Sequence, residues 1–326
     1  MTELIDPFGR KVEYLRLSVT DRCDFRCFYC IPKGFKGFTA SDNHLNLHEF
    51  VRLIRLFSEL GVDKIRITGG EPLVRPDISE LISGLSELPG INDLSMSTNA
   101  SQLAAHAHEL KKAGIGRINV SLDSLQPDRF QNITQGNLDK VIEGLLAARD
   151  ADIHPIKINM VVMRDRNLDE VGNMVDFCIE HGFTLRFIET MPVGAAGQSA
   201  KESYVSLDEV RTILADRFEF EPCKMTGAGP AKYVRIKGER LKIGFITPMS
   251  QHFCDSCNRI RLSCEGTLYL CLGQQDKLEM RPLIRQGLSD KELKSEILNA
   301  IKRKPEKHEF NTSPNQVVRV MSMTGG

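Results

Sequence analysis

The chain has 326 residues, and its 43 Lys and Arg balance 43 Asp and Glu, so the formal net charge at pH 7 is zero. A neutral chain lacks the long-range positive field that general nucleic-acid binding requires, and a small anionic ligand bound by a local cluster of cations is the better expectation. With 41% hydrophobic and 26% charged residues, the composition excludes disorder and collagen-like repeats. The length predicts about two domains.

The sequence contains no sign of a membrane or secretory segment. No apolar run approaches the roughly 18 residues that a membrane helix needs, and the first residues, Met1 to Pro7, lack the apolar core of a signal peptide. We therefore expect a cytoplasmic protein that binds neither membrane nor nucleic acid. Nine cysteines in a reducing compartment are more typical of metal or redox sites than of disulfides, so their spacing is informative.

Short β-rich runs alternate with amphipathic stretches over the first two thirds of the chain. The expected strands are Tyr14 to Val19, Lys64 to Thr68, Leu94 to Thr98, Arg117 to Ser121, Ile156 to Val162 and Leu185 to Glu189. Asn46 and Asn167 are each followed three residues later by Glu, the spacing of a capping box at a helix start. The alternation predicts parallel strands joined by crossover helices, in an open sheet or a barrel, with ligands at the carboxyl ends of the strands.

The pattern changes at about residue 221 to strands punctuated by Gly and Pro, followed by a second group of cysteines. A charged helix is expected from Ser289 to Lys304. We therefore predict two domains, residues 1–220 and residues 221–326.

The first group of cysteines, Cys23, Cys27 and Cys30, forms a CxxxCxxC pattern after the first strand. Three thiolates suit a [4Fe–4S] cluster, and because no fourth cysteine lies nearby, one iron is left open to a small chelating molecule. The alternative is a zinc site completed by a distant ligand such as His44 or His48, although the three-residue first gap is unusual for zinc.

The second group of cysteines consists of Cys254, Cys257, Cys264 and Cys271. All four could form a zinc ribbon. Arg259 and Arg261 lie two residues apart on an expected strand and so point the same way, towards an anionic or carbonyl-rich ligand that a structural zinc site does not need. The spacing alone leaves zinc and a second iron–sulfur cluster open.

The first cysteine pattern, with an aromatic residue before its last cysteine, together with Gly69-Gly70-Glu71-Pro72, resembles the signature of radical S-adenosylmethionine enzymes. Further segments extend the match to residues 6–10, 15–23, 64–72, 185–189 and 253–262 and to the terminal Gly-Gly pair. Together they resemble the GTP 3′,8-cyclase family, which catalyses the first step of molybdenum cofactor biosynthesis. The resemblance covers essentially the whole chain.

The resemblance implies a fold and a reaction. The fold is an α/β, partial (β/α)6 TIM-type barrel followed by a smaller C-terminal domain with an auxiliary cluster. The cofactors are two [4Fe–4S] clusters and S-adenosylmethionine, whose 5′-deoxyadenosyl radical takes the hydrogen from C3′ of GTP before C3′ bonds to C8 of guanine. Expected partners are a second copy of the chain, an electron donor such as flavodoxin or ferredoxin, and the downstream cyclic pyranopterin monophosphate synthase.

The resemblance also implies site residues. The metal ligands are Cys23, Cys27, Cys30, Cys254, Cys257 and Cys271. S-adenosylmethionine is contacted by Tyr29, Gly70, Ser121 and Met191, and GTP by Arg16, Arg66, Ser97, Lys157, Arg259, Ile260 and Arg261. Catalytic roles fall to Arg16, Gly325 and Gly326, and Cys264 is expected to be a spectator because the family usually has another residue there.

The residues themselves support a triphosphate ligand. The chain has no GxxxxGK[ST] loop, so phosphates must be met by side-chain cations. Arg16, Arg66 and Lys157 lie on three separate expected strands and can be aimed into one barrel. Two other functions are weighed against GTP cyclisation: a two-cluster electron-transfer protein, and a peptide-modifying radical enzyme with an auxiliary cluster.

Overall fold

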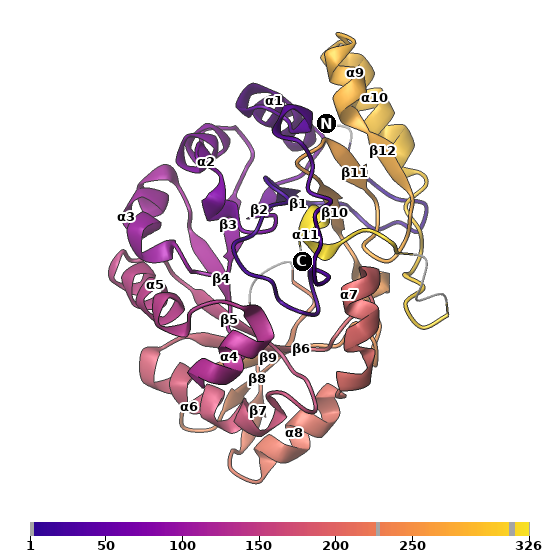
Figure 1. Ribbon diagram of the computed structural model, residues 1–326. Helices are drawn as coiled ribbons and strands as arrows, with labels where there is room; N and C mark the ends of the chain where they lie inside the picture. Colours follow the sequence, from indigo (N-terminus) through magenta and orange to yellow (C-terminus); the bar gives the residue numbers. More distant parts are fainter. Residues whose placement is uncertain (1–2, 226–228, 313–316, 326) are drawn as a thin grey trace.

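The computed structural model describes residues 3–225, 229–312 and 317–325, and within them one curved sheet of twelve strands forms the centre of the molecule (Figure 1). Its strand order is β12-β11-β10-β1-β2-β3-β4-β5-β6-β9-β8-β7. The strands are β1 (Tyr14–Ser18), β2 (Lys64–Thr68), β3 (Asp93–Thr98), β4 (Arg117–Ser121), β5 (Ile156–Val161), β6 (Thr184–Ile188), β7 (Phe220–Pro222), β8 (Lys232–Ile236), β9 (Lys242–Ile246), β10 (Arg259–Leu262), β11 (Thr267–Tyr269) and β12 (Lys277–Glu279).

The described residues form eleven α-helices, most of which cover the outer face of this sheet. They are α1 (Leu47–Glu59), α2 (Ile78–Ser86), α3 (Leu103–Ala113), α4 (Pro127–Thr134), α5 (Leu138–Asp150), α6 (Val171–His181), α7 (Gly194–Ser199), α8 (Leu207–Ala215), α9 (Met280–Arg285), α10 (Asp290–Ile301) and α11 (Met321–Thr324). Figure 1 shows α1, α2, α3, α5, α6 and α8 around the outside, whereas α11 lies on the inner side. None of the helices in the described ranges is long and apolar enough to cross a membrane.

The six strands expected from the sequence are all present, and β1 to β6 pair in parallel, which confirms the partial (β/α)6 barrel. Two strands from the C-terminal part of the chain extend the same sheet in parallel, β10 beside β1 and β9 beside β6. Antiparallel neighbours, β11 with β12 and β8 with β7, continue the sheet outward at its two ends. The C-terminal segment therefore adds strands to both ends of the barrel sheet.

Alternation along the strands decides what faces the helices and what faces the barrel interior. In β1, Leu15 and Leu17 are fully buried among the apolar side chains of the core, which also include Phe50 and Phe57 of α1. Arg16 lies between the two leucines and therefore points to the opposite, inner face. The apolar residues fix the sheet against the helices, and the residues between them are left to line the interior.

The side-chain cap expected at Asn46 is present, whereas the one expected at Asn167 is not formed. Asn46 and Glu49 form a capping box at α1, in which each backbone N–H donates to the other residue's side chain at 2.9 Å. Asn167 caps nothing; its Nδ2 donates to the carbonyl oxygens of Asp123 at 2.7 Å and Val161 at 2.9 Å. This side chain is used to hold together the loops that follow β4 and β5, so its hydrogen bonds go to tertiary contacts.

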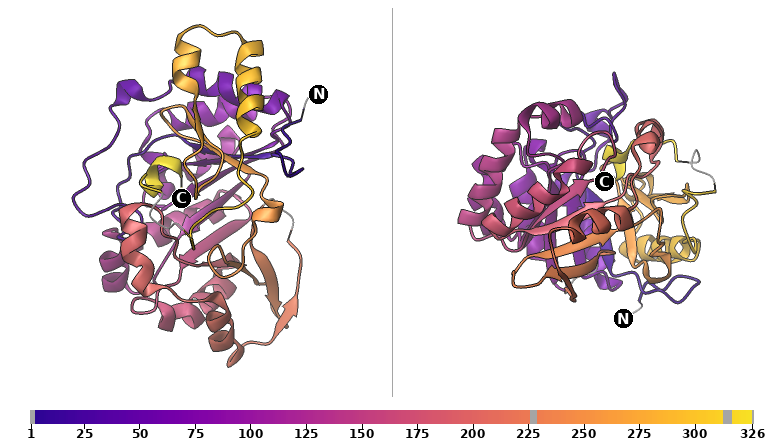
Figure 2. Two further views of the ribbon diagram at one scale, coloured as in Figure 1. Left: turned by 90° about the vertical axis from the view of Figure 1, so that its right-hand side faces the viewer. Right: turned by 90° about the horizontal axis from the view of Figure 1, so that it is seen from below.

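The charged helix expected at residues 289–304 is present as α10, with Ser289 as its N-cap. After α10 the chain returns to the interior. In the views of Figures 1 and 2, α11 lies inside the molecule.

A buried ion pair ties the N-terminal segment to the C-terminal part of the chain. Arg10 Nε donates to Asp6 Oδ2 at 2.5 Å, and both residues are buried. The Arg10 guanidinium also donates to the carbonyl oxygens of Cys254 at 2.8 Å, Pro305 at 2.6 Å and Glu306 at 2.5 Å. One side chain thus satisfies three carbonyls, one of which belongs to a cysteine of the second group.

We expect Arg10→Ala to lower the stability of the protein by about 3–5 kcal/mol, because it leaves the Asp6 carboxylate buried and unpaired. The melting temperature of the anaerobically purified protein should fall by about 5–10 °C. Lys11→Ala is the matched control, since Lys11 pairs with Glu3 and Glu13 at the surface and such pairs contribute little. Equal melting temperatures for the two variants would contradict the anchoring role of Arg10.

Candidate functional site

Three arginines lie side by side on the inner face of the barrel. In the register of the sheet, Arg16 of β1 pairs with Arg66 of β2 on one side and with Arg261 of β10 on the other. Arg66 is buried, and its Nε donates to the Tyr14 hydroxyl at 2.7 Å. The parallel pairing of β1 with a strand 240 residues further along the chain is what brings these cations into one row.

A second row continues around the barrel through β3, β4 and β5. Ser97 pairs with Asn119, and Asn119 pairs with Lys157. Asn119 Nδ2 donates to Ser97 Oγ at 3.4 Å. On β6, Arg186 pairs with Asn159 of β5, two residues further along the strand than Lys157.

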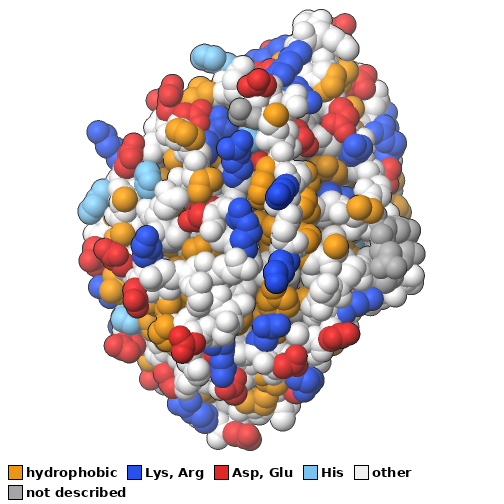
Figure 3. All heavy atoms as spheres, in the orientation of Figure 1, with side chains coloured by type: hydrophobic (Ala, Val, Ile, Leu, Met, Phe, Trp, Pro, Cys, Tyr) orange, Lys and Arg blue, Asp and Glu red, His pale blue; other side chains and the backbone are white. Residues whose placement is uncertain are grey.

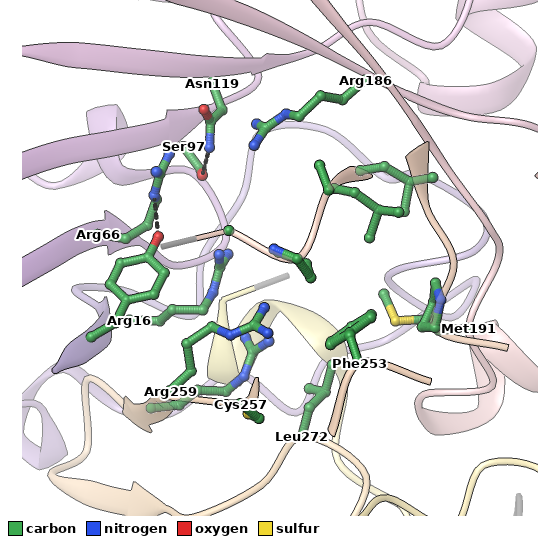
Figure 4. Close-up of a pocket in the computed structure, with 18 of the residues that line it drawn as sticks. Arg16, Arg66, Ser97, Asn119, Arg186, Met191, Phe253, Cys257, Arg259 and Leu272 are labelled. Atoms are coloured by element: carbon green, nitrogen blue, oxygen red, sulfur yellow. Dashed lines mark hydrogen bonds between the residues drawn. The ribbon is translucent and has the colours of Figure 1, made fainter. Parts of the chain in front are cut away.

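These rows line one cavity. Its described wall contains seven Lys and Arg residues and neither Asp nor Glu: Arg16, Arg66, Arg117, Lys157, Arg186, Arg259 and Arg261. Figure 4 shows Arg16, Arg66, Arg186 and Arg259 reaching into this space from different strands, with Met191, Phe253 and Leu272 on the other side. From outside, Lys and Arg side chains lie along an apolar strip in the middle of the molecule (Figure 3). A polyanionic ligand with an apolar portion fits such a wall.

The crowding of positive charge shifts the proton equilibria of the wall. Burial, with Arg186, Arg117 and Arg66 nearby, lowers the pKa of Lys157 to about 7. Burial lowers the pKa of Arg16 to about 10; Tyr14 opposes this shift, and Arg66 and Arg259 add to it. These cations repel one another, and the described wall contains no Asp or Glu side chain to offset them.

Several buried polar atoms of the wall also lack a hydrogen-bond partner among the described residues. They are Arg66 Nη1, Arg186 Nε, Arg259 Nε, Asn119 Oδ1 and Asn159 Oδ1. Buried polar groups are almost always paired in folded proteins. The guanidinium nitrogens among them are donors, so a ligand rich in oxygen acceptors would satisfy them.

The second group of cysteines borders the same cavity. Cys254, Cys257 and Cys271 all line it, and each lies within the electrostatic reach of the others. Burial acts to raise the pKa of Cys257, but the charges of Lys304 and Arg259 outweigh it, and the net pKa is lowered. Lys304 is buried and donates from Nζ to the backbone carbonyls of Arg259 at 3.0 Å and Leu270 at 2.8 Å. This favours the thiolate of Cys257, the form that binds metal, whereas burial raises the pKa of Cys254 and of Cys271.

Cys264 is not part of this triad. It is buried behind β10, does not line the cavity, and has Asp21 and Glu265 as its charged neighbours. The four-cysteine zinc ribbon left open by the spacing is therefore not the arrangement that the chain adopts.

The first group of cysteines lies beside the carboxyl ends of β1, β2 and β3. Cys23, Cys27 and Cys30 are mutually close, and burial raises the pKa of Cys30 to about 12. Asn99 Nδ2, at the end of β3, donates to Cys23 Sγ at 3.8 Å. The expectation that this loop follows the first strand and faces the strand ends is met.

The spacing of the thiols fits a cluster better than one zinc ion. A tetrahedral zinc ion with Zn–S bonds of about 2.3 Å would hold its sulfurs within about 4 Å of one another. Neither triad is so compact: in the described parts of the chain, the one group of three or more ligand atoms within 4.8 Å of one another is Asp21, His44 and Cys264. His48 is exposed on α1, and neither it nor His44 completes the first triad.

The Gly69-Gly70-Glu71-Pro72 segment packs directly against the loop of the first triad. A Cβ on Gly70 would lie 2.1 Å from the carbonyl oxygen of Arg22, so no other residue fits. Glu71 is fully buried and accepts from the Thr98 hydroxyl at 2.7 Å and from the Asn99 N–H at 2.6 Å. Burial raises the pKa of Glu71 to about 7, against these hydrogen bonds. This carboxyl joins the ends of β2 and β3 below the triad.

The other residues expected to contact S-adenosylmethionine are spread around the rim. Ser121 ends β4 with its side chain exposed, and Met191 lines the cavity wall. The Tyr29 hydroxyl donates to Asp123 Oδ2 at 2.6 Å, an interaction that the sequence did not predict. Burial raises the pKa of Asp123 to about 6.

The tail of the chain lies between the two triads. The backbone of Ser322 in α11 hydrogen-bonds to the Cys30 thiol, and the Arg261 guanidinium donates to the carbonyl oxygens of Thr324, at 3.2 Å, and Gly325. Gly325 has φ +70°, and a Cβ there would lie 2.1 Å from Thr68 Cγ2. Gly325 is thus brought to Arg261 as expected, whereas Gly326 lies outside the described residues.

The structure adds wall residues that the sequence reasoning missed. Arg117, Asn119 and Arg186 all line the cavity. Asn119 and Arg186 each lie between two buried apolar residues of an expected strand, which is the same signal that pointed to Lys157, and Arg117 is the first residue of β4. That signal identifies a face of a strand but not the side on which the helices pack, so it could have raised these residues only as candidates.

Comparisons with known proteins agree with this site. Residues 17–178 match the family model described as Radical SAM superfamily, and residues 183–310 match Molybdenum Cofactor Synthesis C. The chain is 47% identical over 329 residues to a GTP 3′,8-cyclase of Hydrogenovibrio crunogenus, covering 99% of both chains. It is 48% identical to GTP 3′,8-cyclase 1 of Pseudomonas aeruginosa over the full length of both.

A solved structure supports the fold. The crystal structure of Streptococcus suis SuiB bound to S-adenosylmethionine matches with a TM-score of 0.62 at 17% identity, over 84% of this chain and 64% of SuiB. Under two thirds of that longer protein is matched, so the likeness concerns the architecture. Two family models that together span most of the chain, and relatives matched end to end, show that the chain belongs to the GTP 3′,8-cyclase family of radical S-adenosylmethionine enzymes.

Proposed function

We propose that this chain converts GTP to (8S)-3′,8-cyclo-7,8-dihydroguanosine 5′-triphosphate, the first step of molybdenum cofactor biosynthesis. One observation carries the proposal: a cavity with seven Lys and Arg residues and no carboxylate in its described wall is bordered by a triad of cysteines. A nucleoside triphosphate brings both the negative charge for the cations and a base for the metal centre. The peptide-modifying and electron-transfer alternatives have no use for such a wall, and the relatives favour the cyclase.

A [4Fe–4S] cluster held by Cys23, Cys27 and Cys30 supplies, with S-adenosylmethionine, a 5′-deoxyadenosyl radical that abstracts hydrogen. Backbone at Gly70 can approach the cosubstrate without interference from a Cβ, and Ser121, Met191 and Tyr29 complete its contacts. The protein's own task is to orient the two substrates and to keep water and other hydrogen donors away from the radical.

The cations position the triphosphate. Arg16, Arg66 and Lys157 are fixed on three strands of a rigid sheet, so they hold phosphate oxygens without reorganisation. The buried Arg66 carries an unpartnered Nη1, which phosphate can accept from. Ser97 begins the second row, on β3, and is placed to contact the ribose side of the nucleotide.

The base is placed at the second triad. Cys254, Cys257 and Cys271 would hold the second cluster, which would bind the guanine base. Arg259 and Arg261 flank this position on β10, with Ile260 between them. The Gly325 carbonyl accepts from Arg261, which orients that guanidinium. We assign Gly325, Gly326 and Arg16 to the catalytic step through this arrangement.

The remaining parts of the proposal concern organisation and partners. Residues 1–220 form the domain that generates the radical, and residues 221–326 form the domain that carries the second cluster and the tail. The enzyme works in the cytoplasm as a homodimer, accepts electrons from a flavodoxin or ferredoxin, and passes its product to cyclic pyranopterin monophosphate synthase. Nine free cysteines are consistent with a reducing compartment.

The test is anaerobic reconstitution of the full chain with iron and sulfide, followed by incubation with S-adenosylmethionine, a reductant and either GTP, ATP or CTP. We expect cyclised product from GTP alone. Equal 5′-deoxyadenosine formation with every nucleotide would contradict the assignment.

Two cysteine variants separate the roles of the triads in the same assay. Cys23→Ser should abolish cleavage of S-adenosylmethionine, because it removes a ligand of the cluster that supplies the electron. Cys257→Ser should retain some cleavage but stop cyclisation, because the guanine is no longer held. Retained cyclisation in Cys257→Ser would refute the anchoring of the base.

The proton equilibrium of Lys157 predicts a pH dependence of GTP binding. The pKa of about 7 means that the free site loses this charge above neutrality, whereas a bound triphosphate keeps the ammonium protonated. Binding therefore takes up a proton, and Kd for GTP should rise about eightfold between pH 7.5 and 8.5. Calorimetry in buffers of different ionisation enthalpy measures both the affinity and the proton uptake.

Lys157→Arg is the control for this effect, since arginine stays protonated across the interval. Its Kd should be nearly independent of pH over the same range. A slope in the variant as steep as in the parent chain would assign the proton to another group.

We expect Gly325→Ala to slow cyclisation at least about tenfold, because the added Cβ meets Thr68 and the backbone stays at positive φ. Product formation is measured together with 5′-deoxyadenosine release. Thr68→Ala opens space for the added methyl, so the double variant should recover part of the lost activity. Full activity of the single variant would remove the tail from the site.

A further inference from the structure

A compact group of metal-ligating side chains lies away from the cavity. The ligand atoms of Asp21, His44 and Cys264 are all within 4.8 Å of one another, and none of the three residues lines the cavity. They come from three segments: the loop between β1 and the first cysteines, the residues before α1, and the turn between β10 and β11. Figure 1 shows α1, β1, β10 and β11 gathered at this side of the molecule.

Two atoms of this group are buried without a hydrogen-bond partner in the described structure. Asp21 is 1% exposed, and its Oδ1 accepts no hydrogen bond; His44 Nε2 is in the same position. The two atoms are 3.5 Å apart, which is at the outer limit for a hydrogen bond and satisfies the geometry of none. The two atoms form a long ion pair with each other but no hydrogen bond, and with a buried thiol beside them they have unused capacity to bind a metal ion.

The other oxygen of Asp21 is fixed. The Thr39 N–H donates to Asp21 Oδ2 at 2.6 Å, and the Thr39 hydroxyl donates to Glu265 Oε1 at 2.7 Å. The carboxylate is therefore oriented with Oδ1 turned towards His44. Hydrogen bonds of this kind, made to the atom that does not bind, commonly orient the ligands of metal sites.

We propose that Asp21, His44 and Cys264 form a binding site for a single zinc ion, with water in the fourth position. The donor set of one carboxylate oxygen, one imidazole nitrogen and one thiolate sulfur suits a borderline ion such as Zn²⁺ better than hard cations, which prefer oxygen, or Cu(I), which prefers sulfur. A thiolate and a carboxylate together neutralise the ion, so burial is tolerated.

The site joins the loops that follow two neighbouring strands of the sheet, β1 and β10. Asp21 lies two residues before Cys23, and Cys264 lies two residues after the end of β10, which carries Arg259 and Arg261. Zinc would tie the loop of the first triad to the strand beside the second triad. The inference goes beyond GTP cyclisation and does not rest on it, because none of its ligands is assigned to substrate or to either cluster.

The experiment uses the full chain with both triads loaded with iron and sulfide, purified without oxygen. Two equivalents of Zn²⁺ are added, weakly held metal is removed by gel filtration with a mild chelator, and zinc, iron and acid-labile sulfide are measured. We expect about one zinc ion per chain to be retained with iron unchanged. X-ray absorption at the zinc edge should show one sulfur and two or three nitrogen or oxygen ligands.

Cys264→Ala and His44→Gln should each lower retained zinc at least about tenfold at unchanged iron content. Matched controls are Cys178→Ala, a buried thiol on α6, and His48→Gln, an exposed imidazole on α1, and both should keep the zinc. Unchanged iron and sulfide in each variant show that the chain has folded.

Three results would overturn the proposal. Zinc retained equally by Cys264→Ala and the parent chain would place the ion elsewhere. A zinc environment with three sulfurs would assign it to one of the cysteine triads. Failure of the cluster-loaded chain to retain zinc would leave His44 and Asp21 as an ion pair only.

Discussion

The arrangement of the barrel interior depends on uncompensated positive charge. Lys and Arg side chains, with no Asp or Glu among the described residues of the wall, are held on the inner face of the sheet, where each one raises the cost of charging the next. The protein tolerates this repulsion because apolar residues at the alternate positions fix the same strands against the outer helices. A cavity prepared in this way is selective for a highly charged anion, since a neutral ligand would leave the repulsion unrelieved.

The two cysteine triads and the tail determine how a ligand can be oriented within this positively charged cavity. The first triad stands at the strand ends, the second at the wall, and α11 lies between them with contacts to Cys30 and, through Gly325, to Arg261. Under the proposed function, the two metal centres would hold the reacting part of the nucleotide while the cations of the wall hold its phosphates. The carbonyl of the tail also occupies hydrogen-bonding capacity of Arg261, which limits where that guanidinium can turn.

Much of the fold was accessible from the sequence because local patterns and tertiary structure agree. The six barrel strands and the capping box at Asn46 follow from alternation and cap chemistry. Asn167 has the same local pattern, but its side chain makes tertiary hydrogen bonds that a sequence window cannot register. The first triad was recognisable by spacing, whereas spacing left Cys264 as a possible member of the second group. Arg186 and Arg117 were not singled out, since a lone cation on a strand does not reveal which face is inner. The group of Asp21, His44 and Cys264 joins residues more than 200 positions apart, beyond any local signal.

The pairing of β1 with β10 has a consequence for how the chain reaches its native state. About 240 residues separate these neighbours, so one edge of β1 has no partner until nearly four fifths of the polypeptide has been synthesised. An unpaired strand edge is a site for wrong association, and contacts between such distant positions form slowly. β1 can pair with β2 as soon as both strands are made, but its other edge stays open until β10 has been made, so the loop of the first three cysteines lies next to an incomplete sheet until late in synthesis.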